Sequence, residues 1–297
     1  MMSKSMICGL FAAILTMTGI SASGLSTHTP HSGHLCAGLV PENNLQIPAN
    51  MFAAGGITKN QFNQVIERVK SIYEPEIRSM GGSLTINGYW DDSTVNANAV
   101  KFGNDRVINI YGGLARFYSV DVEGLALAVC HELGHHLGGG PKYSEPNDWG
   151  GLEGTADYFA TLKCLRRYFA SEDNERALAG KKIDPTAKAA CEAQYPNARE
   201  KFICLRASLA SEQLAEMYQM ITQSGAKPKF NTPETYQVTE LYEEYPTPQC
   251  RMDTYLQGML CRENEYTRMS DTDFKQGSCY APRDKVGARP GCWFVAN

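Results

Sequence analysis

The segment from Asp121 to Pro141 constrains the fold of this 297-residue chain more than any other. Its apolar residues recur at helical spacing with small apolar residues between them, so a helix here is apolar nearly all round. The run 138–141, Gly-Gly-Gly-Pro, stops such a helix. The sequence therefore predicts a helix with a buried face that begins near Asp121. Its apolar positions are Val122, Leu125, Ala126, Leu127, Ala128 and Val129.

Three of the six histidines fall inside this predicted helix, and no histidine follows position 136. In the run His131-Glu132-Leu133-Gly134-His135 the two histidines are four residues apart. Such residues are neighbours on a helix surface, so both imidazoles can bind one zinc ion, whereas His136 is expected to face away. Glu132 can then act as general base toward a zinc-bound water, whose pKa zinc lowers toward ~7. The alternative is a solvated helix face with two ordinary histidines.

A catalytic zinc site takes three protein ligands and a water, so one more ligand is needed. Because no histidine follows position 136, a carboxylate is the expected third ligand. Glu153 and Asp157 are four residues apart near the start of a predicted helix at 152–169, so they share one helical face. Glu153 can bind zinc, and Asp157 can hold the other ring nitrogen of a ligand histidine. The alternative is a solvated helix start, which the helix dipole favours.

The order of these motifs resembles that of the gluzincin metallopeptidases, specifically the family that includes HtpX, the prenyl proteases and BepA. H-E-L-G-H is followed by E-G-T-A-D, as in that family. Asn96-Ala97-Asn98-Ala99 and the predicted strand 106–111 resemble its N-A-x-A segment and edge strand. Tyr245 and Arg251 keep the spacing of its H-P-x-x-x-x-R-I motif, with tyrosine where the family has histidine. The resemblance covers about residues 57–255.

The resemblance implies an α+β, mainly helical zincin fold, with a small sheet whose edge strand lines the active-site cleft. It also implies a zinc-dependent endopeptidase with one zinc ion per chain and a peptide or protein as substrate. An extended substrate would pair with the strand 106–111, with Asn96 and Ala97 among its contacts. The zinc ligands implied are His131, His135 and Glu153. Glu132 is then the base, and Asp157 is the hydrogen-bond partner of a ligand histidine.

Peptide hydrolysis also needs a donor for the oxyanion that forms when the carbonyl is attacked. With no histidine after position 136, tyrosine or arginine should supply it. Tyr245 and Arg251 are the first candidates for this donor, and Tyr143 is the next. The alternative for Tyr245 is a packing residue before Pro246.

The first residues predict an export signal. Lys4 provides a basic start, and the apolar run 6–20 is short of a membrane span. Small residues at 21–24 favour cleavage near residue 22 or 23, and an uncleaved anchor is the alternative. No later segment approaches ~18 apolar residues. We therefore expect an exported chain, periplasmic or secreted, with no membrane span after cleavage.

The chain has ten cysteines, and loss of Cys8 with the signal leaves nine. This density outside the cytosol predicts disulfides, and the odd number leaves one thiol that is free or pairs between chains. Cys130 and Cys164 are either a disulfide between the two metal-bearing helices or two buried thiols. The local candidate pairs are Cys191 with Cys204, Cys250 with Cys261, and Cys279 with Cys292.

Local patterns divide the rest of the chain. A capping box at Thr58 and Gln61 opens a helix that Gly81 and Gly82 end. Strands are predicted at 83–90, 96–102 and 106–111, and further helices at about 199–223 and 247–262. The predicted parts are a signal peptide at 1–23, an irregular arm at 24–56 with solvated His28, His31 and His34, a metallopeptidase domain at 57–262 and a Cys-rich C-terminal extension at 263–297 packed on it.

The net charge of −4 disfavours a nucleic-acid-binding protein, which usually carries a basic surplus. A rival to the enzyme is a periplasmic chaperone or assembly factor that contains zinc and has little or no protease activity. The intact Glu132 argues against that rival, because a protein without catalysis need not keep the base.

Overall fold

The computed structural model describes residues 34–35, 38–51 and 56–295. The predicted signal peptide, His28, His31 and Cys36 lie outside the described residues. The described part combines helices with a small sheet, which confirms the predicted α+β class. Among the described residues, no helix is both long and apolar enough to cross a membrane.

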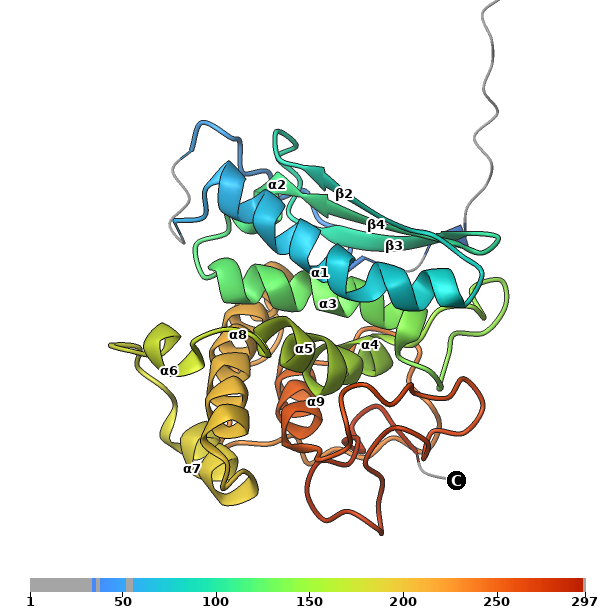
Figure 1. Cartoon of the computed structure of the whole chain (residues 1–297), viewed down its shortest axis with the longest axis vertical. Coiled ribbons are helices and arrows are strands. Elements are labelled where there is room, and N and C mark those ends of the chain that lie inside the picture. The colour runs from blue at the N-terminus through green and yellow to red at the C-terminus, as the bar shows by residue number, and fades with distance from the viewer. Residues whose placement is uncertain (1–33, 36–37, 52–55, 296–297) are drawn as a thin grey trace, which may run out of the picture. The chain divides into compact units, whose positions relative to one another are not determined.

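Helix α3 (Val122–Leu137) lies at the centre of the described structure. Asp121 caps it, since its carboxylate accepts from the backbone N–H of Glu123 at 2.8 Å. All residues of α3 after Val122 are buried. The sheet covers one side of α3, and α4 (Glu153–Phe159), α8 (Ala198–Thr222) and α9 (Pro248–Leu260) lie on the other side (Figure 1). The prediction of a buried helix is therefore confirmed.

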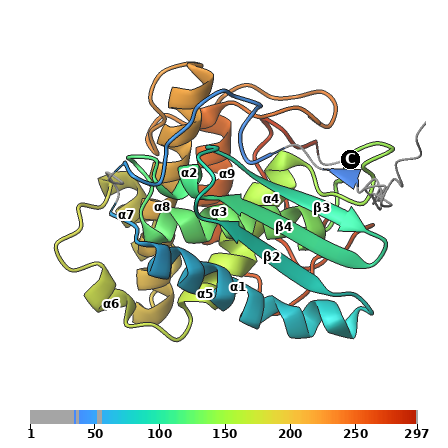
Figure 2. The same ribbon diagram turned by 90° about the horizontal axis from the view of Figure 1, so that it is seen from above.

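The sheet has four strands in the order β1-β3-β4-β2. β4 (Asp105–Tyr111) pairs in parallel with β2 (Leu84–Tyr89) and antiparallel with β3 (Ala97–Phe102). β4 therefore lies inside the sheet, as Figure 2 also shows, and the expectation that it forms the edge was wrong. The sequence suggests three strands but not their order, because the parallel pairing joins segments that are not adjacent along the chain. The outer edge of β3 pairs with the two-residue β1 (His34–Leu35).

The flanking helices agree closely with the sequence patterns. α1 (Lys59–Ser79) begins at the predicted capping box, where the Thr58 hydroxyl accepts from the backbone of Gln61 at 3.2 Å. The predicted helix 152–169 is continuous but contains one π-helical turn, η1 (Ala160–Cys164), between α4 and α5 (Leu165–Phe169). Three short helices were not predicted: α2 (Gly112–Ala115), α6 (Asn174–Ala177) and α7 (Pro185–Gln194). Of these, α7 carries a recognisable start, an Asp N-cap followed by Pro.

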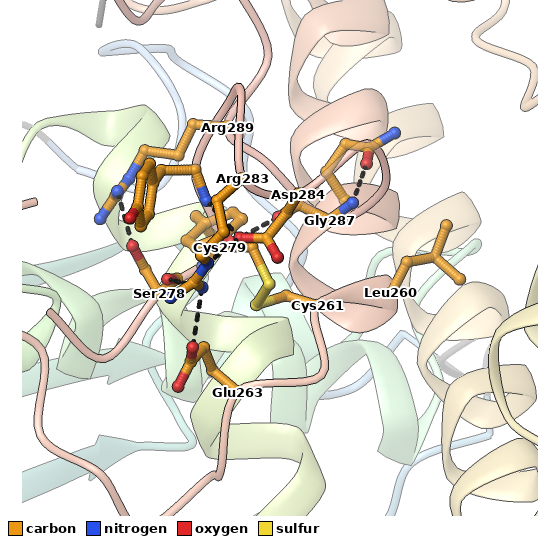
Figure 3. The surroundings of a disulfide bond; sticks show 12 residues. Leu260, Cys261, Glu263, Ser278, Cys279, Arg283, Asp284, Gly287 and Arg289 are labelled. Atoms are coloured by element: carbon orange, nitrogen blue, oxygen red, sulfur yellow. Dashed lines mark hydrogen bonds and ion pairs between the residues drawn. A yellow bond between two sulfur atoms is a disulfide. The ribbon is translucent and has the colours of Figure 1, made fainter. Parts of the chain in front are cut away.

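All eight cysteines in the described residues form disulfides, which indicates an oxidising compartment. Cys130–Cys164 joins α3 to η1, and Cys191–Cys204 joins α7 to α8. The pair Cys191–Cys204 confirms the prediction, and Cys130–Cys164 is the disulfide of the two alternatives that the sequence left open. Two further disulfides hold the C-terminal segment 263–295: Cys250–Cys292 joins it to α9, and Cys261–Cys279 joins it to the residue that follows α9. Figure 3 shows the second of these, Cys261–Cys279.

The predicted pairs Cys250 with Cys261 and Cys279 with Cys292 were wrong. Cys250 lies in the first turn of α9, and Cys261 directly follows its last residue. With a rise of ~1.5 Å per residue, their Cα atoms are about 16 Å apart, far beyond the ~7 Å that a disulfide allows. Each therefore pairs with a cysteine of the C-terminal segment.

The described part of the predicted arm, residues 34–35, 38–51 and 56, is irregular apart from β1 and is not a solvated tail throughout. Leu39 and Val40 are 1% and 0% exposed and belong to the main hydrophobic core. Further along, Gln46 forms an isolated bridge with Thr94. Residues 38–40 of the arm are thus packed against the rest of the chain, whereas residues 44–46 and 48–51 are exposed.

Candidate metal centre

Helix α3 carries two imidazoles whose Nε2 atoms point toward the same location. The Nδ1 of His131 donates to the carboxylate of Asp157 at 2.7 Å, and the Nδ1 of His135 donates to the carbonyl of Gly151 at 2.7 Å. These bonds orient both rings and leave each Nε2 to face the same point. Both Nε2 atoms are buried and have no hydrogen-bond partner.

Glu153, the first residue of α4, completes the group. α4 approaches α3 closely because position 134 is glycine: a Cβ there would lie 2.7 Å from the Cα of Ala156. This contact brings the Glu153 carboxylate within 3.3 Å of the His131 Nε2 and 3.5 Å of the His135 Nε2. The glycine inside the H-E-L-G-H run therefore has a packing role as well.

The three side chains can hold a metal ion. One ligand atom from each of His131, His135 and Glu153 lies within 4.8 Å of the others. Ligands ~2.1 Å from a tetrahedral zinc ion are separated by ~3.4 Å, which agrees with the two nitrogen–oxygen distances above. The unpartnered Nε2 atoms and the Glu153 Oε2 also point to a missing partner. The donor set and its spacing therefore fit a single metal ion.

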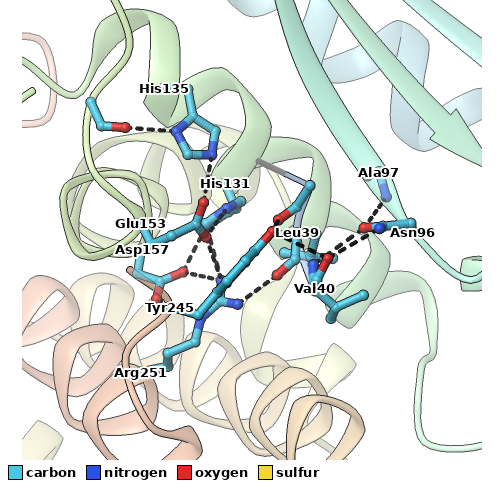
Figure 4. Close-up of polar contacts among 12 residues, drawn as sticks. Leu39, Val40, Asn96, Ala97, His131, His135, Glu153, Asp157, Tyr245 and Arg251 are labelled. Atoms are coloured by element: carbon cyan, nitrogen blue, oxygen red, sulfur yellow. Dashed lines mark hydrogen bonds and ion pairs between the residues drawn. The ribbon is translucent and has the colours of Figure 1, made fainter. Parts of the chain in front are cut away.

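A buried ion pair supports the first ligand from behind. Arg251, on α9, donates from Nε and Nη2 to the two carboxylate oxygens of Asp157 at 2.8 and 2.7 Å (Figure 4). Burial alone would raise the pKa of Asp157, but Arg251 and His131 outweigh it and hold this pKa well below its usual range. The same carboxylate opposes the effect of burial on His131, whose pKa rises to about 9. Asp157 is thus a permanent anion that orients the His131 ring.

Glu132 is the unusual acid of the site. Its side chain is 0% exposed, and neither carboxylate oxygen has a hydrogen-bond partner. Burial raises the pKa of Glu132 to about 8. A buried carboxylate without partners is costly and is typical of functional sites.

The other predicted site residues divide into two groups. Tyr143 lies at the ligands, since its hydroxyl donates to the Glu153 Oε1 at 3.0 Å and its ring stacks on His135. Tyr245 does not bond the ligands: its hydroxyl lies 2.7 Å from the carbonyl oxygen of Gly38. Asn96 and Ala97 also contact the segment that begins at Gly38 (Figure 4).

His136 is not part of the ligand group. Its ring stacks on Trp149 at a centroid distance of 4.9 Å, and its Nε2 lies 3.4 Å from the carbonyl oxygen of Val107. Sequence reasoning did not find the Gly151 carbonyl that orients His135, nor the position of residues 38–40 beside the site. Capping and periodicity are local sequence signals, and neither the Gly151 contact nor the position of residues 38–40 has such a signal.

Comparisons with protein-family models, with curated proteins and with solved structures gave no match. The resemblance to the gluzincin family therefore stays a prediction from the motifs.

Proposed function

We propose that this chain is an exported, zinc-dependent endopeptidase of the gluzincin type. The observation that carries the proposal is the pairing of a three-ligand group with an adjacent buried acid. His131, His135 and Glu153 converge, and Glu132 lies next to them in sequence with no hydrogen bond to either carboxylate oxygen. A purely structural metal site has no need for such an acid.

The donor set favours zinc over other common metals. Two imidazole nitrogens and one carboxylate oxygen suit zinc, whereas calcium and magnesium prefer sites made of oxygen alone. Three protein ligands leave a fourth position for water, as in catalytic zinc sites. Bound zinc would supply a water with a pKa near ~7 and polarise the substrate carbonyl.

The side chains around the ligands would divide the remaining work. Glu132 would take the proton from the attacking water and pass it to the leaving amine. Asp157 would keep the His131 ring oriented, and Arg251 would keep Asp157 ionised. Because Nε and Nη2 of Arg251 both bond Asp157, we assign Arg251 a positioning role in place of the predicted role as oxyanion donor. Tyr245 and Tyr143 are the candidate donors.

The substrate would bind as an extended strand on the outer edge of β3. This edge replaces the strand 106–111, which lies inside the sheet. Asn96, directly before β3, and Ala97, its first residue, offer an amide side chain and a backbone carbonyl to a neighbouring strand. Strand addition of this kind recognises the main chain of the substrate.

Zinc analysis combined with a digestion assay tests the proposal. The purified protein should contain one zinc ion per chain and cleave casein or a peptide library, and a chelator should stop cleavage. Glu132→Gln should keep zinc and lose at least a hundredfold in rate, because the base contributes about 10²–10⁴-fold. Glu153→Ala should lose zinc as well.

Unchanged hydrolysis by Glu132→Gln would contradict the proposed mechanism. One zinc ion per chain without hydrolysis, both in the wild type and in Gly38→Val, would favour the non-catalytic zinc protein instead. Normal zinc content in Glu153→Ala would remove Glu153 from the ligand set.

A further inference from the structure

Residues 38–40 already lie along the edge of β3 where the proposed substrate would bind. The backbone N–H of Leu39 donates to the carbonyl of Ala97 at 3.0 Å. The Asn96 side chain bonds both backbone groups of Val40: it accepts from the N–H at 3.2 Å and donates to the carbonyl at 3.1 Å. Asn96 and Ala97 are the two residues assigned above to the substrate backbone.

The direction of this segment is also that of an added strand. Upstream of it, β1 pairs antiparallel with β3, so that Leu35 lies opposite Val100 near the far end of the strand. Leu39 lies beside Ala97, near the start of β3. The chain therefore runs antiparallel to β3 on both sides of residues 36–37.

The other side of the segment faces the side chains around the metal centre (Figure 4). The carbonyl of Gly38 accepts from the Tyr245 hydroxyl at 2.7 Å, and the carbonyl of Leu39 accepts from the Arg251 Nη1 at 2.6 Å. The Nη2 of this arginine lies 3.8 Å from the Glu153 Oε2. Backbone carbonyls of the chain itself thus accept from the Tyr245 hydroxyl and from the Arg251 Nη1 on this side of the candidate metal centre.

The segment is held firmly in this place. The side chains of Leu39 and Val40 belong to the main core, and displacing them would expose apolar surface to water. The candidate ligands and the adjacent acid are closed off, since His131, Glu132, His135 and Glu153 are all 1% exposed or less. An extended peptide cannot pair with this part of β3 while residues 38–40 remain there.

We infer that residues 38–40 are an internal occupant of the substrate-binding edge, so that substrate hydrolysis stays slow until this segment moves away. The inference rests on the proposed function, because it takes the outer edge of β3 as the substrate site. It adds that the contacts of residues 38–40 with Asn96 and Ala97 keep the protein in a state of low activity.

A substitution at Gly38 can displace the segment without changing any residue of the candidate metal centre or of β3. A Cβ at this position would lie 2.7 Å from the Asn96 Oδ1 and 2.9 Å from the carbonyl oxygen of Ala97. The larger side chain of Gly38→Val should therefore push the segment off the edge. Asn44→Val, at an exposed position on the same arm, is the matched control. Gly88→Ala, whose Cβ would press on Ile66 and Phe62 away from the metal centre, controls for general destabilisation.

Two measurements on the zinc-loaded full chain test the inference. The first is the rate at which a chromogenic chelator removes zinc, and the second is the rate of peptide hydrolysis. We expect Gly38→Val to raise both rates at least tenfold, and both controls to keep the wild-type rates. Tyr245→Phe, which removes one hydroxyl that holds the segment, should raise the chelation rate at least twofold and serves if Gly38→Val does not fold.

Wild-type chelation and hydrolysis rates in Gly38→Val would overturn the inference, as would an equal acceleration in Gly88→Ala. If Gly38→Val does not fold, a wild-type chelation rate in Tyr245→Phe would overturn it. Faster chelation with no hydrolysis in any variant would support residues 38–40 as a barrier to the metal but would refute the endopeptidase. Failure of the inference and failure of the proposed function therefore give different results.

Discussion

Asp157 and His131 form a hydrogen bond of 2.7 Å in a place where both side chains are 0% exposed. Asp157 lies on α4 and His131 on α3, so the bond depends on the packing of these two helices. Arg251 reaches the same carboxylate from α9. The orientation of the first metal ligand thus depends on three helices at once.

Asp157→Asn should lower the affinity for zinc about 10- to 100-fold, because the His131 ring loses its anionic partner. It should also destabilise the fold by about 3–5 kcal/mol, since Arg251 is then a buried charge without its carboxylate. Competitive zinc titration and chemical unfolding measure the two effects. Asp253→Asn is the control, a buried aspartate on α9 that does not contact the ligands. Wild-type zinc affinity in Asp157→Asn would contradict the role of this bond.

Tyr245→Phe separates the two roles of the tyrosine when it is made in the Gly38→Val chain. There the segment is displaced, so the hydroxyl is free to donate to the substrate oxyanion. We expect kcat to fall at least tenfold while zinc content is unchanged, in line with the loss of one oxyanion donor. Steady-state kinetics on a peptide substrate measures this. If kcat is unchanged in the double variant, Tyr245 has no part in the chemistry and Tyr143 becomes the remaining candidate.

Removal of the Cys130–Cys164 disulfide should cost more stability than removal of Cys191–Cys204. The two bonds span 34 and 13 residues. The loop-entropy relation gives about 4 and about 3 kcal/mol for loops of these lengths. Paired Cys→Ala variants unfolded in guanidinium chloride under non-reducing conditions provide the comparison. A larger loss of stability for the shorter loop would show that the enthalpy of local packing outweighs chain entropy here.

Asp253 should make stability depend on pH between about 4 and 6. Burial raises the pKa of Asp253 to about 6 in the folded chain, against about 3.9 for an unfolded one. In this interval the folded state binds more protons than the unfolded state, so the free energy of unfolding falls as pH rises. The group accounts for a loss of about 3 kcal/mol across the interval, and no further loss above it.

The measurement is the difference in unfolding free energy between the wild type and Asp253→Asn at several pH values. The advantage of the wild type should shrink by up to this amount from pH 4 to 6 and then stay constant. The other titrating groups cancel in the difference. A difference that does not vary with pH would show that Asp253 titrates normally.

Much of the fold could be predicted from local patterns. The capping box at Thr58 and the Gly-Gly-Gly-Pro run at 138–141 mark helix boundaries through short-range hydrogen bonds and backbone geometry. The two candidate metal ligands on α3 follow from helical spacing alone. Glu153 required one further argument, the absence of any later histidine.

The sheet order and the disulfides of the C-terminal segment could not be predicted in this way. β2 and β4 are adjacent in the sheet, but β3 lies between them along the chain. Cys250 and Cys292 meet only because the C-terminal segment folds back on α9. Neither arrangement has a signal within a short window of sequence.

The chain itself specifies the chemistry of this protein: two histidines and a glutamate on one helix, and a carboxylate pair that opens the next. Packing determines whether that chemistry is accessible. Tyr245 meets Gly38 across 207 residues, and Val40 meets Asn96 across 56. Contacts between residues so far apart in sequence depend on how the whole core assembles. Burial of Leu39 and Val40 in that core stabilises the arm in this position.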